Sequence, residues 1–164
     1  MFKQRTQTAV LRLLTVFIAF VFIQSLFFKF TDSPETQYIF GTLDSWAGSL
    51  GFPGLFARHG IFSQYVVGTA ELIASCTLLV GAIAKKPALQ CAAALLSLGV
   101  ISGAIFFHLF TPLGVQVRNA DGTLDGGELF ALACGVWVSA AAIAFLLRAH
   151  LTSWLKLRFR PAST

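Results

Sequence analysis

The sequence predicts an all-α integral membrane protein, in which four membrane-spanning helices form a bundle and a short amphipathic outer helix lies between spans 1 and 2. Three observations support this fold class. Of the 164 residues, 56% are hydrophobic and only 12% are charged, which leaves little surface for water. Four apolar stretches are each about 20 residues long, the length that a helix needs to cross a bilayer core. Finally, the connecting segments divide the charges into two groups.

These two groups of charges predict the orientation of the helices. The segments before the first stretch, between the second and third, and after the fourth, together with their flanks, contain nine basic residues and no acid. The two other segments and their flanks hold six of the seven acids, namely Asp32, Glu35, Asp44, Asp121, Asp125 and Glu128. Because cytoplasmic loops of membrane proteins are enriched in Lys and Arg, we expect both termini to face the cytoplasm.

The first span is predicted at about 9–30. It follows Lys3 and Arg5 and ends in an aromatic and cationic edge, Phe27 to Phe30, that suits the membrane interface. A cleaved signal peptide has a shorter apolar core and a small-residue cleavage site, so we expect this segment to be retained as an anchor.

The amphipathic outer helix is predicted at about 34–50. Ser33 is suited to be its N-cap and Pro34 to be its first residue. Its apolar residues recur at spacings of four, three and four: Ile39, Leu43, Trp46 and Leu50. This spacing favours a helix with one apolar face, which lies on the bilayer surface or folds over the bundle.

The remaining spans are predicted at about 62–84, 88–110 and 128–148. A short turn, Lys85-Lys86-Pro87, joins the second to the third, so these two helices should be antiparallel neighbours. The connection to the fourth span contains the turn signals Asp121-Gly122 and Asp125-Gly126. Since the loops are short, all four spans belong to one domain, 1–164.

Small residues recur along three of the spans: Ala70, Ala74, Thr77 and Gly81; Gly99 and Gly103; Ala131, Gly135 and Ser139. Small side chains let helix backbones approach closely in a membrane. We expect these residues to pack inside the bundle, with an interface in a homo-oligomer as the alternative.

A set of polar residues lies in the outer third of the predicted membrane region. Glu71 lies six residues after Tyr65, where the second apolar stretch enters the membrane, and hence roughly 9 Å below the boundary. A lone carboxylate at this depth is costly, so it should face the bundle and either have a partner or be protonated. Gln24 and Lys29 of the first span and His108 of the third reach the same region. We therefore predict that Gln24, Lys29, Glu71 and His108 surround an outward-facing polar pocket that binds a ligand.

Each of these residues also has a structural interpretation. Lys29 can anchor in the headgroups or pair with Glu71 as an internal staple. His108 can cap helix carbonyls, and Gln24 can link two helices by a hydrogen bond. Glu128 follows Asp125 at the spacing of a capping box.

Several functional classes are not predicted. Cys76, Cys91 and Cys134 all lie within spans and form no CxxC motif, which favours packing over thiol–disulfide chemistry. The histidines have no companions at metal-ligand spacing, so no metal site is expected. The basic residues lie at helix ends, where lipid headgroups account for them, and no nucleic-acid partner is expected.

The first span ends in Lys29-Phe30-Thr31 and the second contains Gly68-Thr69-Ala70-Glu71. These segments, and the order of the four spans, resemble the DoxX-like family of small four-helix membrane proteins over about residues 10–147. The resemblance implies a multi-pass protein of the bacterial inner membrane. It also implies a link to quinone-coupled oxidation of sulfur compounds or to oxidative-stress complexes at the membrane. It carries no agreed catalytic residue.

The leading functional interpretation is a non-catalytic membrane subunit or anchor of a redox-associated assembly, either quinone-linked or concerned with oxidative stress. The chain would then not be an enzyme on its own but a subunit of an oxidoreductase complex with a soluble or membrane redox partner. Its polar pocket would hold a small polar ligand or a quinone headgroup.

Two alternatives stay open. The first is a small-molecule or proton-coupled transporter in which Glu71 changes its protonation state. The second is a structural or assembly factor in which Lys29 and Glu71 form an internal staple. The lipid bilayer is a partner in every interpretation.

Overall fold

The computed structural model describes residues 2–158. Its helices are, in order, α1 (Phe2–Phe30), α2 (Pro34–Ser49), α3 (Gln64–Ile83), α4 (Pro87–Phe110) and α5 (Glu128–Arg158). α1, α3, α4 and α5 are each long and apolar enough to cross a membrane, which confirms the predicted all-α membrane bundle. The chain is therefore a multi-pass membrane protein. Within the described range there is no β-strand, and a single isolated bridge joins Arg118 to Leu124.

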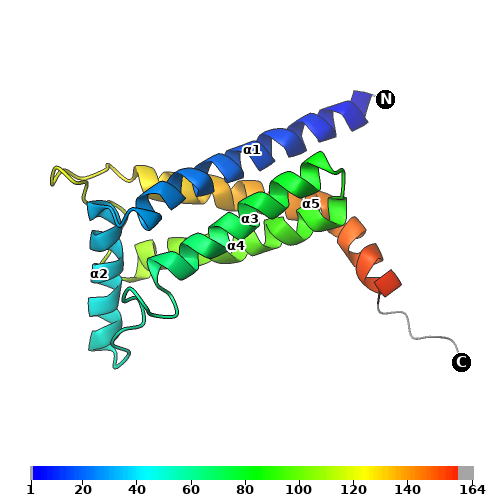
Figure 1. Ribbon diagram of the computed structural model, residues 1–164. Helices are drawn as coiled ribbons and strands as arrows, with labels where there is room; N and C mark the ends of the chain where they lie inside the picture. Colours follow the sequence, from blue (N-terminus) through cyan, green and yellow to red (C-terminus); the bar gives the residue numbers. More distant parts are fainter. Residues whose placement is uncertain (1, 159–164) are drawn as a thin grey trace, which may run out of the picture.

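The four long helices form a ring. α1 packs against α3 and α5, and α4 packs against the same two helices (Figure 1). The largest side chains at the centre of this ring are almost fully buried: Ile18, Phe22, Leu78, Val136 and Ile143. Both ends of the described chain lie at one end of the bundle, which we call the terminal end. α2 and the two long connections lie at the other, which we call the cap end.

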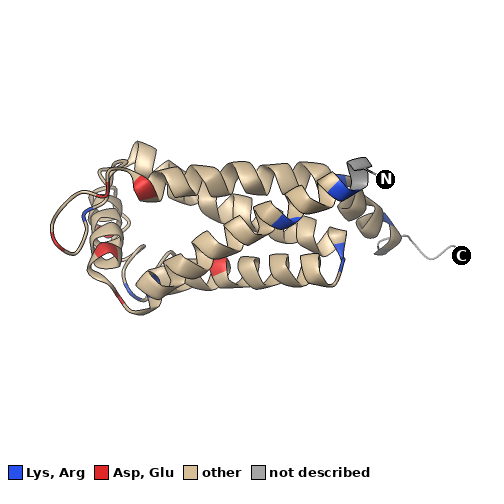
Figure 2. Cartoon of the chain, turned by 90° about the horizontal axis from the view of Figure 1, so that it is seen from above, with Lys and Arg blue, Asp and Glu red and all other residues tan. Residues whose placement is uncertain are grey.

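The helices begin and end close to the predicted positions, with two extensions. α1 already begins at Phe2, and α5 continues past the predicted boundary at 148 to Arg158. The last turns of α5 point away from the bundle in Figure 1. Acidic residues gather at the cap end and most basic residues at the terminal end (Figure 2). The two groups of charges along the sequence thus lie at opposite ends of the bundle.

Some of the small residues of the spans lie in close contact with a neighbouring helix, and others do not. A Cβ atom added to Gly81 would lie 2.8 Å from the backbone nitrogen of Gln90, and one added to Gly135 would lie 3.0 Å from the Phe17 ring. These glycines pack inside the bundle, as expected. A Cβ atom on Gly99 or Gly103 would meet nothing within 4 Å. The expectation of internal packing is therefore wrong for this pair, because α4 turns a different face, which includes Ser97, towards its neighbours.

α2 lies across the cap end of the bundle (Figure 1). Ser33 is its N-cap, with its side chain accepting a hydrogen bond from the Thr36 amide, and Pro34 is its first residue. The apolar face of α2 packs on both long connections in a second core that we call the cap core: Leu43, Ala47, Phe56, Leu113 and Val117. Of the two predicted placements, α2 therefore adopts the one folded over the bundle.

Acidic side chains hold the segments of the cap together. The Asp44 carboxylate accepts a hydrogen bond from the Phe56 amide at 3.0 Å. Glu35 Oε1 accepts one from the Ala120 amide at 2.9 Å. Glu35 and Asp44, two of the acids from which we predicted the orientation of the helices in the membrane, thus also connect α2 to the two loops.

Asp125 holds the second loop to the start of α5. Its Oδ1 atom accepts hydrogen bonds from the amides of Val117 at 2.8 Å and Gly127 at 2.9 Å, and its Oδ2 atom accepts one from Leu129 at 3.2 Å. The predicted capping box between Asp125 and Glu128 is wrong. The Asp125 amide, which the Glu128 side chain would need, instead donates to the Val117 carbonyl at 2.9 Å.

These contacts predict an acid-sensitive cap. Burial raises the pKa of Asp125, but the amide hydrogen bonds and the neighbouring His108 outweigh it and hold that pKa below its usual value. A carboxyl with a lowered folded-state pKa adds stability above its unfolded pKa, and this stability is lost as the pH falls through the folded pKa. We expect lower protection from amide exchange, relative to the intrinsic exchange rate at the same pH, in residues 111–127 below about pH 4.

Replacing Asp125 tests this assignment at neutral pH. Asp125→Ala should cost about 1–3 kcal/mol of cap stability, because three amides lose a charged acceptor. The measurement is hydrogen exchange of the segment 111–127, read by mass spectrometry. Glu128→Gln is the matched control, since the exposed Glu128 carboxylate has no such contacts. Equal exchange in both variants would contradict the role of Asp125.

Candidate functional site

The candidate residues of α1 and α3 meet in an ion pair at the cap end of the bundle. Lys29 Nζ lies 3.0 Å from Glu71 Oε2 and donates a hydrogen bond to Glu71 Oε1 at 3.1 Å. The Lys29 and Glu71 side chains are only 16% and 7% exposed. Ser25 completes the network: its hydroxyl donates to Glu71 Oε2 at 2.6 Å and accepts from Lys29 Nζ at 3.0 Å.

Helix geometry explains why these three side chains meet. Ser25 and Lys29 are four residues apart on α1, so they face the same neighbour. A Cβ atom on Gly68 of α3 would lie 3.5 Å from Lys29 Cδ and 3.4 Å from the Phe30 ring. α1 and α3 therefore approach closely at Gly68. The Lys29 methylene groups pass over this glycine to reach Glu71, one turn further along α3.

A further side chain, Gln64, links this site to the end of α1. The Gln64 amide nitrogen donates to the Lys29 carbonyl at 3.0 Å and to Asp32 Oδ1 at 2.8 Å. Gln64 is buried at the first turn of α3, two turns before Glu71. It satisfies a carbonyl in the last turn of α1, where no intrahelical donor is available.

Ser25 and Gln64 were not among the site residues predicted from the sequence. Ser25 lies one helical turn before Lys29, and Gln64 lies seven residues before Glu71 on the same helix face. Those spacings were the signal that could have found them.

The structure does not bring the other two predicted residues to this pair. Gln24 is exposed on α1, since the adjacent Ser25 takes the position that faces α3. His108 is buried, but its Nδ1 atom lies 2.7 Å from the Gly114 carbonyl, and its ring packs against Phe130. His108 thus ties α4 to the loop that follows it and to the start of α5.

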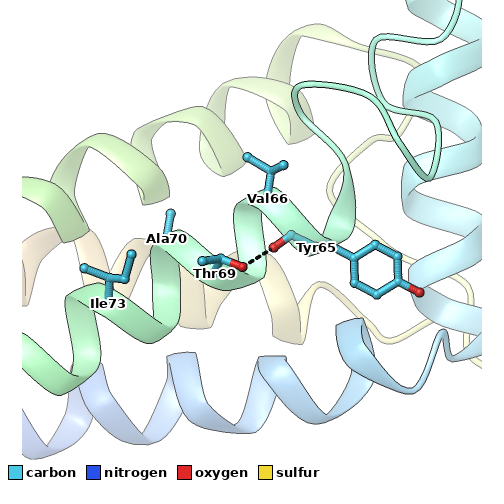
Figure 3. A pocket seen from close by; sticks show the side chains of 5 residues that line it. All are labelled: Tyr65, Val66, Thr69, Ala70 and Ile73. Carbon is cyan, nitrogen blue, oxygen red and sulfur yellow. Dashed lines mark hydrogen bonds between the residues drawn. The ribbon is translucent and has the colours of Figure 1, made fainter.

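Two shallow hollows lie near this region, and neither is lined by Lys29 or Glu71. Figure 3 shows the first, where five side chains follow one side of α3: Tyr65, Val66, Thr69, Ala70 and Ile73. The Thr69 hydroxyl in it donates to the carbonyl of Tyr65 at 2.7 Å, so its hydrogen is turned back to the helix. The second hollow lies in the cap, between α2 and the loop around Arg58, and Asp32, Asp44 and Gln64 also line it.

A second interhelical hydrogen bond lies nearer the terminal end. The Gln90 amide nitrogen of α4 donates to Thr15 Oγ1 of α1 at 2.8 Å, and both side chains are buried.

The three cysteines are free thiols, and Cys91 contacts the Ala144 carbonyl at 3.6 Å. Over residues 2–158, no group of three or more His, Cys, Asp or Glu side chains could hold a metal ion.

The fold and the site define a class of protein: a four-helix membrane bundle with a buried lysine–glutamate pair between its first and second spans. No family model, curated protein or solved structure matches this chain. Membership of the DoxX-like family therefore stays a prediction from the segments around Lys29 and Glu71.

The close approach at Gly68 yields a test of this geometry. Gly68→Ala should be tolerated, because its added Cβ would make ordinary van der Waals contacts at 3.4–3.5 Å. Gly68→Leu should lower the free energy of unfolding by about 1–3 kcal/mol, since the larger side chain would displace Lys29 from Glu71. The two variants are compared by unfolding in detergent micelles. Equal stability would show that the Lys29 side chain does not depend on space at Gly68.

Proposed function

We propose that this protein is a non-catalytic membrane subunit or anchor of a redox-associated assembly. One observation supports the anchor role above all: the Glu71 carboxylate is already occupied by Lys29 and Ser25, in a contact that is closed within the bundle. A carboxylate has about four acceptor positions, and three hydrogen bonds or ion contacts use most of them. Such a group holds α1 against α3 and leaves little capacity to bind a substrate.

The redox part of the proposal rests on the resemblance to DoxX-like proteins. The two segments that carry this resemblance contact each other through Lys29 and Glu71, so they belong to one structural unit. In this proposal the assembly is quinone-linked or acts in oxidative stress, and the chain holds a soluble or membrane redox partner at the bilayer.

The proposed location is the bacterial inner membrane, with both termini in the cytoplasm. The separation of acids at the cap end from bases at the terminal end supports this orientation, because Lys and Arg are retained on the cytoplasmic side.

The test is to purify the tagged protein from bacterial membranes in a mild detergent and to assay electron transfer to a soluble quinone. We expect the co-purified complex to reduce the quinone and the isolated chain to be inactive. Activity of the isolated chain would contradict the non-catalytic role. A complex without any redox-active partner would contradict the redox assignment and leave the anchor role.

A structural or assembly factor is the second candidate, and the closed Lys29–Glu71 contact favours it equally. It predicts a tight partner and no electron transfer. We do not propose transport, because Ile18, Phe22 and Leu78 fill the centre of the bundle between Glu71 and the terminal end.

A further inference from the structure

The segment between α2 and α3 exposes large apolar side chains although it lies outside the four spans. We call residues 50–62 the overhang. Leu50, Phe52, Ile61 and Phe62 in it are 56%, 63%, 68% and 46% exposed. The loop between α4 and α5 also exposes Val115 and Leu124, at 41% and 56%, but its tip, residues 120–123, exposes only small or polar residues. Exposed apolar side chains that cluster in this way mark a surface that is covered by something other than water.

The overhang lies beside the bundle rather than on top of it. α2 crosses the cap end, and its C-terminal end and the loop that follows project past α3 and α4 (Figure 1). Ile61 and Phe62 come directly before Ser63, the N-cap of α3, so they lie at the level where that span begins. Because the spans fix the bilayer around the bundle, the overhang reaches over the lipid that surrounds α3 and α4.

A row of aromatic rings connects the overhang to the lipid-facing side of α4. The Phe62 ring contacts Phe56 with centroids 5.8 Å apart, and Phe56 contacts Phe107 at 5.1 Å. Phe107 in turn contacts Phe106 at 5.5 Å, and Phe106 contacts Phe110 at 5.2 Å. Phe106 and Phe110 are exposed on a membrane-spanning helix, where lipid covers them. The exposed rings of the overhang and of α4 are therefore connected through the buried Phe56 ring of the cap core.

The charged residues of the overhang also suit a position at the surface of the bilayer. Arg58 and His59 are exposed within it. Arg58 donates a hydrogen bond to the Tyr65 hydroxyl at 3.0 Å, and its guanidinium lies 5.6 Å from the centre of the Tyr65 ring. Within the described chain, no carboxylate lies at ion-pair distance from Arg58. A cation held beside aromatic rings at the end of a span is suited to bind a phospholipid phosphate.

We propose that the overhang inserts into the headgroup region of the leaflet at the cap end. Phe52, Ile61 and Phe62 contact the upper part of the acyl chains, and Arg58 binds a lipid phosphate. The partner is the phospholipid surface rather than a second copy of the chain, because the apolar row continues onto a lipid-facing helix and the free charge is a cation. Insertion would hold α2 parallel to the membrane and keep the cap core closed over the bundle.

The test measures how closely the overhang approaches lipid. A parent protein without tryptophan carries Phe in place of the three natural residues, Trp46, Trp137 and Trp154. Ile61→Trp in this parent, reconstituted in phosphatidylcholine vesicles, should lose roughly half of its fluorescence or more when the lipids are brominated in the upper acyl chain. Ala120→Trp, at the polar tip of the other loop, is the matched control and should be quenched much less.

Two results would overturn the proposal. Quenching of Ile61→Trp as weak as that expected for Ala120→Trp, with red-shifted emission, would mean that the overhang is in water. Blue-shifted emission of Ile61→Trp without quenching would mean that protein, such as a second copy, covers it. If the parent fails to fold, Ile61→Cys and Ala120→Cys in the natural protein give a second measurement with a membrane-impermeant maleimide, in which the labelling of the unsubstituted protein, with its three free thiols, is subtracted. Protection of Ile61→Cys in vesicles, lost in detergent, supports insertion, and equal labelling in vesicles overturns it.

Discussion

Lys29→Met is expected to lower the free energy of unfolding by about 3–5 kcal/mol, because the Glu71 carboxylate then stays buried without a counter-charge. Methionine keeps most of the apolar chain that passes over Gly68, so the loss reports on the charge. Glu71→Gln should cost less. The Lys29 side chain is the more exposed partner, and its ammonium can extend towards the membrane surface when the carboxylate is absent.

The double variant Lys29→Met/Glu71→Gln should recover most of the stability lost by Lys29→Met. Replacing both members of a buried ion pair is often close to neutral, whereas removing one partner leaves an uncompensated charge. The measurement is a double-mutant cycle by unfolding in detergent micelles, with Lys156→Met, an exposed cation at the terminal end, as the control. Additive effects of the two single changes would contradict the staple.

The same cycle separates the staple from a ligand pocket. If Lys29 and Glu71 only hold α1 against α3, the double variant should also keep its partner during purification. If the two charges bind a ligand, the double variant should fold normally and still lose function. The predicted ligand-binding role of these residues is thereby tested on a protein of near-normal stability.

Gly81→Ala is expected to destabilise the bundle by about 1–3 kcal/mol, the range typical of overpacking. Its Cβ atom would lie 2.8 Å from the backbone nitrogen of Gln90 and 2.9 Å from its Cα atom. These are backbone atoms in the first turn of α4, so α3 and α4 would have to separate. The movement would also displace the Gln90 side chain from Thr15.

Gly99→Ala and Gly103→Ala are the matched controls for this prediction. Their Cβ atoms would meet nothing within 4 Å, and alanine is the better helix former by about 1 kcal/mol. We expect both variants to be as stable as the natural protein or more so, in the same unfolding assay. Equal losses for Gly81→Ala and Gly99→Ala would contradict the packing of α4 described above.

The fold could be predicted from the sequence because its main signals are local and additive. A run of about 20 apolar residues predicts a spanning helix whatever its neighbours are. The Ser33-Pro34 pair predicted the start of α2, since capping depends only on residues within one turn. The face that a helix turns to its neighbours could not be predicted from such local signals. Gly99 and Gly103 have the spacing of a packing motif, yet the arrangement of four helices leaves them on the outside.

The candidate site was predicted only in part, because the sequence indicates how deep a residue lies in the membrane but not which way it faces. The cost of a carboxylate within a span predicted that Glu71 has a partner or is protonated, and depth along the helices reduced the candidate partners to Lys29 and His108. Depth along an axis contains no information about rotation around it. Gln24 lies at a suitable depth, but its neighbour Ser25 occupies the direction that faces α3.

The amino-acid sequence by itself determined the number of spans, the separation of charges to two ends, and the need for Glu71 to be either paired or protonated. Each of these follows from the transfer of single side chains and backbone groups between water and lipid, which depends little on the rest of the fold. Only the tertiary structure decided which side chain pairs with Glu71, which glycines are in contact, and that acids such as Asp125 hold the cap together. Those choices depend on the rotation and spacing of whole helices, which the summed packing of many distant residues sets.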